Sequence, residues 1–225
     1  KNLPIVPITD LTIKDNSLIV ATQGRSIWML DDLTVIHQLS SSVNEEKLYK
    51  PKDSYRMRGA GGRKSLTAGT NLPNGVIIHY FLPSFNEESD EVKLSIHSID
   101  GSLIKEFSNK SKENLMKVKK GGNSFVWNMK YSGAKRLDKM VLWGADFSGA
   151  KAVPGDYIVK LKVNEKELTQ DFTIHKDPTS EGSIEDIKAQ FEFVNEINGV
   201  VADAHNAIEN IRKIKNDLNK FQSDY

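Results

Sequence analysis

The chain has 225 residues, of which 38% are hydrophobic and 27% are charged, and its net charge is +1. This composition supplies enough apolar material for a core, and the balance of 31 basic and 30 acidic residues disfavours a strongly basic nucleic-acid-binding protein. The absence of cysteine excludes disulfide bonds, thiolate zinc sites and cysteine nucleophiles. No apolar run approaches the roughly 20 residues that a membrane-spanning helix needs, so no membrane span is expected.

Residues 1–38 have the pattern of a short β-meander. Tight turn clusters separate three predicted strands, which cover residues 9–14, 18–22 and 26–30. Three strands of this size have little core of their own, so we expect them to pack against another part of the protein. Residues 39–74 show no periodicity and contain a serine run and a glycine run, which predicts an extended linker.

Residues 75–178 have the pattern of an immunoglobulin-like or fibronectin-III-like antiparallel β-sandwich. Six or more short strands are separated by turns, such as the turn at Asp100-Gly101, and several strands alternate apolar with polar residues. Tyr157 follows a Pro-Gly turn and matches the tyrosine corner of such folds. We therefore expect its ring to be buried and its hydroxyl group to bind a nearby backbone group.

Residues 183–221 are predicted to form one long amphipathic helix. Ser183 and Asp186 have the spacing of a capping box, with aspartate in place of the preferred glutamate. At 1.5 Å per residue the helix would be about 57 Å long. Apolar residues recur every three or four positions, and the distal part of the stripe consists of Ile208, Ile211, Ile214, Leu218 and Phe221. We expect these five residues to form a seam for a partner helix, most simply an antiparallel second copy in a homodimer.

Six segments of the chain carry a family resemblance. They are Pro7–Leu11 with Asp15–Asp32, Asn71–Ile77, Ile99–Gly101, Gly122–Asn128, Pro154–Tyr157 and Asp177-Pro178. Together they resemble the C-terminal part of large secreted bacterial proteins that carry a sortilin-like β-propeller with sialidase-type (BNR) repeats and are often labelled glycosyl-hydrolase-like. The first segment is similar to the end of the last propeller blade. The middle segments are similar to an immunoglobulin-like domain of the kind found in the flagellar hook-cap protein. Gln23 departs from the blade pattern, in which relatives usually have histidine.

The resemblance implies a function but no catalytic residues. It implies a non-catalytic accessory module that contacts its own propeller and a partner protein, outside the bacterial cell or in the periplasm. Because the chain opens on Lys1, we expect a piece of a longer protein. The alternative is a carbohydrate-binding module of a glycoside hydrolase whose active site lies in the absent propeller. Whether the parent protein is an enzyme stays open, and no cofactor or metal is expected.

Aromatic and basic residues supply two candidate binding surfaces. Trp28 and Trp127 fall within strand patterns and are predicted to be core residues, whereas Trp143 lies in a connection and is the candidate surface contact, for a sugar or another ligand. Residues 105–120 contain six lysines against two glutamates. This stretch lacks arginine and interleaved aromatic residues, so we interpret it as a solvated loop and not as a nucleic-acid site.

The remaining candidate motifs favour structural roles. The glycine-rich run at residues 59–65 has Arg63 where a phosphate-binding loop needs a glycine before Lys-Ser, which favours a loop over a nucleotide site. Asp10, Asp31 and Asp32 are interpreted as turn and strand-end residues in preference to the acid pair of a glycosidase. None of the five histidines has metal-ligand spacing; they are His37, His79, His97, His175 and His205.

Overall fold

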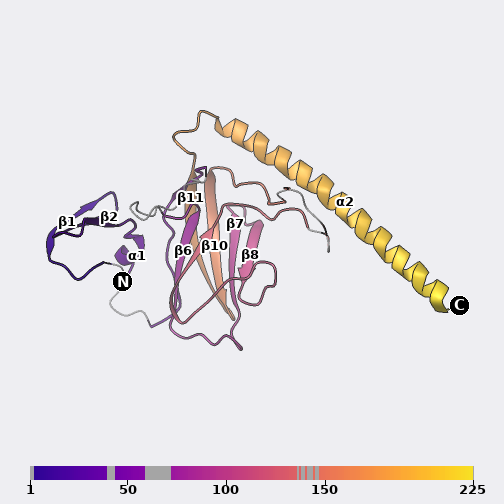
Figure 1. Cartoon of the computed structure of the whole chain (residues 1–225), viewed down its shortest axis with the longest axis horizontal. Helices are drawn as coiled ribbons and strands as arrows, with labels where there is room; N and C mark the ends of the chain where they lie inside the picture. The colour runs from indigo at the N-terminus through magenta and orange to yellow at the C-terminus, as the bar shows by residue number, and fades with distance from the viewer. Residues whose placement is uncertain are drawn as a thin grey trace.

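The computed structural model describes residues 3–39, 44–58, 72–135, 137, 140, 144 and 147–224. In this part the chain is mainly β, with three sheets and one long C-terminal helix (Figure 1). The first sheet has the order β1 (Ile8–Lys14), β2 (Ser17–Thr22), β3 (Ile27–Leu30). The second has the order β5 (Ser54–Tyr55), β11 (Lys166–His175), β10 (Gly155–Val163), β7 (Val92–Ser98), β8 (Leu103–Ser108). The third has the order β4 (Lys47–Leu48), β6 (Val76–Leu82), β9 (Gly121–Trp127).

The second and third sheets share one hydrophobic core. Alternate residues of β6 and β7 are buried, as expected for strands with one face on a core. Trp127 of β9 is fully buried, and its ring lies 6.0 Å from the ring of Tyr157 and 6.2 Å from that of Phe172, measured between centroids. These edge-on contacts join the end of β9 to β10 and β11, so the aromatic rings connect the two sheets.

Tyr157 has the environment that the sequence predicts. Its side chain is 6% exposed, and its hydroxyl group donates a hydrogen bond of 2.6 Å to the carbonyl of Val153. Burial raises the pKa of the Tyr157 phenol, because a phenolate would have to lose its hydration inside the core.

The linker predicted over residues 39–74 contains two short strands in its described portion. β4 pairs antiparallel with β6, and β5 pairs parallel with β11. Leu48 and Tyr49 are buried, so this segment adds apolar contacts as well as backbone hydrogen bonds. Short pieces of the segment predicted as an extended linker thus pair with the sheets, because sheet edges offer unpaired backbone groups that two residues can satisfy.

The β-meander has the three strands predicted, with bounds within one residue of those expected. Asp15 and Asn16 close the first hairpin with φ angles of 49° and 64°, as a tight two-residue turn requires. A four-residue helix that the sequence did not predict, α1 (Thr34–His37), follows the sheet. The carboxylate of Asp32 accepts a hydrogen bond from the backbone N–H of Thr34 at 2.9 Å and so fixes the entry to α1.

The C-terminal helix α2 (Ile184–Asp224) has 41 residues. At 1.5 Å per residue it is about 61 Å long, and Figure 1 shows its distal end projecting away from the sheets. The backbone N–H of Asp186 donates to the Ser183 hydroxyl at 3.0 Å, and the Asp186 carboxylate accepts from the Ser183 backbone N–H at 2.8 Å. The predicted capping box is therefore present, and it lowers the pKa of Asp186 through these hydrogen bonds.

Truncation of Tyr157 tests the core. We expect Tyr157→Ala to lower the free energy of unfolding by about 3–5 kcal/mol, because it removes a buried ring against Trp127 and Phe172. Tyr157→Phe should cost about 1 kcal/mol, since it leaves the Val153 carbonyl without its donor. Urea denaturation measures both. Tyr55→Ala, at a half-exposed tyrosine, is the control, and an equal loss there would contradict the assignment.

Alkaline pH should destabilise the protein through Tyr80. Burial raises its pKa to about 12, well above the ordinary value for a tyrosine, because a phenolate would lose its hydration in the core. Above pH 10 the unfolded state releases this proton while the folded state retains it, so the free energy of unfolding falls as pH rises towards 12. We expect Tyr80→Phe to remove a loss on the order of 2 kcal/mol over this range. Urea denaturation on both sides of pH 10 measures it, and identical pH profiles for the unchanged protein and Tyr80→Phe would contradict the prediction.

Candidate interaction surface

One side of α2 packs against a platform formed by two crossing segments. The platform segments, residues 130–133 and 147–152, are joined by a backbone hydrogen bond from Tyr131 N–H to the Ala150 carbonyl at 2.9 Å. A Cβ atom on Gly133 would lie 1.8 Å from the Phe147 carbonyl oxygen, and one on Gly149 would lie 2.3 Å from the Tyr131 carbonyl oxygen. Only glycine permits this crossing, which brings Tyr131 and Phe147 to the helix.

Aromatic and polar contacts then hold the proximal half of α2. The Phe191 ring lies 4.9 Å from the Tyr131 ring, edge to face, and the Phe147 ring lies 5.7 Å from the His205 ring, measured between centroids. His205 is buried, and its Nδ1 is 2.5 Å from the Lys135 carbonyl oxygen. Because a carbonyl only accepts, this nitrogen carries the proton. We call the side of α2 that carries Phe191 and His205 the docked face.

Hydrogen bonds from the side chains of Arg56 and Lys151 hold the N-terminal end of α2 and the segment beside it. Arg56 donates to the Ala152 carbonyl at 2.9 Å and to the Gln190 side chain at 3.3 Å, while Lys151 donates to the Met57 carbonyl at 2.6 Å. Partial burial lowers the pKa of both Arg56 and Lys151, and in Lys151 the neighbouring Arg56 lowers it further. These bonds tie residues 56–57 and the start of α2 to the same platform.

A second apolar stripe on α2 lies away from the docked face. It consists of Phe193, Ile197, Val200, Ala204, Ala207, Ile211, Ile214 and Leu218, which alternate spacings of four and three residues. We call these eight residues the α2 seam. All are exposed; Phe193, Val200 and Ile211 are 63%, 65% and 64% exposed. At 3.6 residues per turn, the seam and the docked face are roughly 140° apart around the helix axis.

The five helix residues singled out from the sequence all lie on exposed helix surface. Ile211, Ile214 and Leu218 belong to the α2 seam, Phe221 continues its spacing, and Ile208 lies at its margin with 38% exposure. The sequence-based stripe did not include Phe193, Val200 or Ala207. Their signal was the strict seven-residue repeat from Phe193 through Val200 to Ala207 and Ile214, which is typical of a coiled-coil seam.

The β-meander has an uncovered apolar face of a different kind. Opposite residues in paired strands lie on the same face, and the pairs in β1, β2 and β3 place six apolar side chains together. They are Leu11, Ile13, Leu18, Val20, Trp28 and Leu30. Val20 at the centre is buried, whereas Leu11, Ile13 and Leu30 are about half exposed or more. The expected strand pairing is present, but the cover expected for this face is absent among the described residues.

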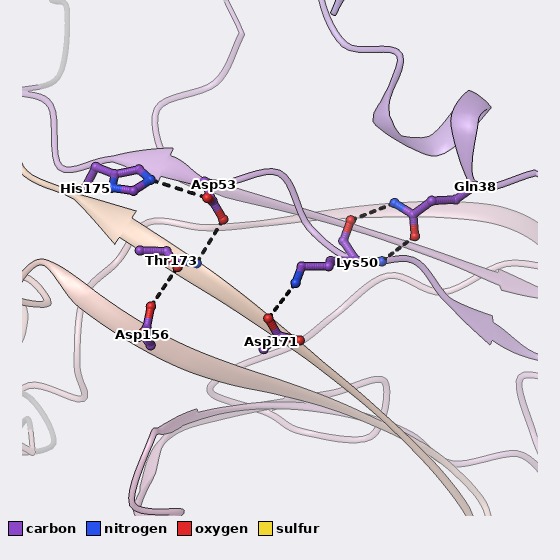
Figure 2. Close-up of polar contacts among 7 residues, drawn as sticks. All are labelled: Gln38, Lys50, Asp53, Asp156, Asp171, Thr173 and His175. Atoms are coloured by element: carbon purple, nitrogen blue, oxygen red, sulfur yellow. Dashed lines mark hydrogen bonds and ion pairs between the residues drawn. The ribbon is translucent and has the colours of Figure 1, made fainter.

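A polar network fastens the chain after α1 to β11 (Figure 2). The side chain of Gln38 binds the backbone of Lys50 twice, accepting from its N–H at 2.8 Å and donating to its carbonyl at 2.9 Å. The Lys50 ammonium group contacts the Asp171 carboxylate at 2.6 Å, which raises the pKa of Lys50 and lowers that of Asp171. Both side chains are largely exposed, so this ion pair positions the segment more than it stabilises the fold.

A second set of contacts, drawn beside the first in Figure 2, contains the pair Asp53 and His175, whose carboxylate oxygen and Nε2 are 3.3 Å apart. A histidine beside a carboxylate is a combination used in acid–base catalysis. Here, however, Asp53 also accepts from the backbone N–H of Thr173 at 3.2 Å, and Thr173 donates its hydroxyl proton to Asp156 at 2.7 Å. The hydrogen bonds of this group join β5 to β10 and β11, and we interpret it as structural.

The other chemical candidates from the sequence are in structural roles or lie outside the described residues. Asp32 accepts from the Asn16 side chain and from the backbone N–H of Thr34 and so closes a turn as interpreted, whereas Asp10 lies within β1 and accepts from the N–H of its neighbour Leu11. Trp143 and the glycine-rich run at residues 59–65 lie outside the described residues. Among the residues described, no group of three histidine or acidic side chains could hold a metal ion. Within the same part of the chain, no helix is long and apolar enough to cross a bilayer.

Comparison of the chain with models of protein families, with curated proteins and with solved structures gave no match. The features of this chain that indicate a function are therefore its two uncovered apolar surfaces, the α2 seam and the apolar face of the β-meander.

Substitution of Phe191 and of Phe193, which are two residues apart, tests whether α2 has a docked face and a separate exposed seam. We expect Phe191→Ala to lower the free energy of unfolding by about 1–3 kcal/mol, because it removes the contact with Tyr131. It should also speed amide hydrogen exchange in the proximal half of α2. Phe193→Ala, the matched control on the seam, should change stability by no more than about 0.5 kcal/mol. Equal effects of the two substitutions would mean that the docked face is wrongly assigned.

Proposed function

We propose that this chain is a non-catalytic interaction module of a larger protein, and that the α2 seam is its binding surface. The observation that carries the proposal is a continuous row of eight exposed apolar residues at heptad spacing, held away from the sheets by a separate docked face. Monomeric proteins seldom leave a contiguous patch of this kind bare, and a strict heptad row is typical of a helix–helix contact.

We also propose that the second and third sheets form an immunoglobulin-like β-sandwich. Three features support this fold type: the core that the two sheets share, the buried Trp127 between Tyr157 and Phe172, and the hydrogen bond from Tyr157 to Val153. Such a domain would provide a rigid body that fixes the direction in which α2 projects.

The parent protein that we propose is a secreted bacterial protein with a sortilin-like β-propeller. The apolar face of the β-meander supports this proposal, because the face of a propeller blade packs against neighbouring blades. On the family resemblance, the module would lie outside the cell or in the periplasm. There it would connect the end of the propeller to whatever binds the α2 seam.

Site-directed photocrosslinking tests the interaction function. A benzophenone amino acid replaces Ile211 on the seam, and in the control it replaces Lys188, an exposed residue outside the seam. In the cells that make the protein, we expect a discrete protein adduct at position 211 that is absent at position 188. The added Leu218→Lys substitution should abolish it, because it places a charge in the apolar row.

The same adduct at both positions, or no adduct at either, would show that the seam is not a binding surface. A glycan-array signal that disappears on Trp143→Ala, together with no adduct at position 211, would instead favour a carbohydrate-binding module.

A further inference from the structure

The flanks of the α2 seam differ in charge. On the side away from the docked face, the positions beside the seam are Glu196, Asp203, Asn210 and Asp217, and all four are exposed. On the side towards the docked face, they are Val194, Val201, Ile208 and Lys215. In coiled coils the residues at these flanking positions select the partner and its direction. The seam therefore has one acidic flank and one mainly apolar flank.

This charge pattern disfavours an antiparallel second copy. When two identical helices run in opposite directions, the same flank of each helix meets. Overlap of the seams would then place Glu196 opposite Asp217 of the copy or, one heptad further, Asp203 opposite Asp217. In each of these two-fold symmetric dimers the pair of facing carboxylates occurs twice. Like charges that face each other across an interface oppose association.

A parallel second copy meets a different obstacle. In that arrangement the acidic flank of one helix faces the apolar flank of the other, so that Glu196 would face Val201 and Asp203 would face Ile208. A carboxylate placed against apolar side chains loses hydration without gaining a partner. Val194 and Val201 are also partly covered already, because they lie on the side of α2 that faces the platform.

The width of the stripe also disfavours a membrane surface as the occupant. Helices that lie in a bilayer interface present a broad apolar face, and basic residues on the polar face strengthen their binding to anionic lipids. The α2 seam has a strict heptad row, and three of the four residues on its outer flank are acidic. An acidic flank would be repelled by anionic lipid head groups.

We infer that the α2 seam binds an α-helix of different sequence, about four heptads long, with an apolar heptad row and with lysine or arginine facing Glu196, Asp203 and Asp217. This inference rests on the proposed interaction function and specifies the chemistry of its partner. The seam from Phe193 to Leu218 spans roughly 38 Å at 1.5 Å per residue, which sets the length of the partner helix. The basic flank of the partner would lie on the side of α2 away from the platform, where no described part of the body obstructs it.

Two synthetic peptides of about four heptads test the inference against the full chain. Both have isoleucine and leucine in the heptad row; one has lysine at every flanking position and the other has glutamate. Each peptide repels itself, so self-association does not compete. We expect the lysine peptide to bind at least about tenfold more tightly than the glutamate peptide by calorimetry. The triple variant Glu196→Lys, Asp203→Lys and Asp217→Lys should reverse this preference, and Ile211→Lys should abolish binding.

Controls separate this inference from the proposed function. Circular dichroism and urea denaturation should show that each variant retains its fold. Light scattering on the chain alone should show a monomer at high micromolar concentration. A dimer that Ile211→Lys dissociates, equal binding of the two peptides, binding of neither, or preferential binding to anionic phosphatidylglycerol vesicles would each overturn the inference. The photocrosslink at position 211 would still report separately on whether the seam is a binding surface.

Discussion

The contact between Phe191 and Tyr131, together with the bond between His205 and the Lys135 carbonyl, determines which side of α2 faces the rest of the chain. A helix with apolar residues on two sides has no preferred orientation from its sequence alone. Once the docked face is fixed, every residue of the α2 seam must point elsewhere, since the two faces are roughly 140° apart. The glycines at 133 and 149 are part of this constraint, because the crossing that they permit places the rings against which the helix packs.

Much of the fold could be predicted from the sequence where a regular pattern persists over several residues. The three strands of the meander and the capping box at Ser183 have strong local signals, and the structure places each close to its predicted position. β4, β5 and α1 were missed because two to four residues are too few to show a period. The positions of β4 and β5 depend on the sheet edges beside them, which are assembled from distant parts of the chain.

The α2 seam shows a different limit of sequence reasoning. Spacings of three and four residues occur on both apolar sides of α2, so a single stripe drawn through the sequence passes from one face to the other. Ile187, Phe191 and Val194 belong to the docked side, whereas Ile211, Ile214 and Leu218 belong to the seam. Only the contacts of Phe191 and His205 separate the two sets. Phe193 is only two residues from Phe191, yet it is exposed, whereas Phe191 packs against Tyr131.

The two uncovered surfaces call for partners of different shape. The apolar face of the β-meander is a small flat sheet, and its natural complement is another sheet at the usual packing distance. The α2 seam is one residue row wide and several heptads long, and its complement is a helix. The docked face ties α2 to the platform, and Gln38 and Lys50 tie the chain after α1 to β11, so both surfaces are connected to the body formed by the second and third sheets. On the proposed function, that body links a β-rich parent to a helical partner, and the acidic flank of the seam determines which helices it accepts.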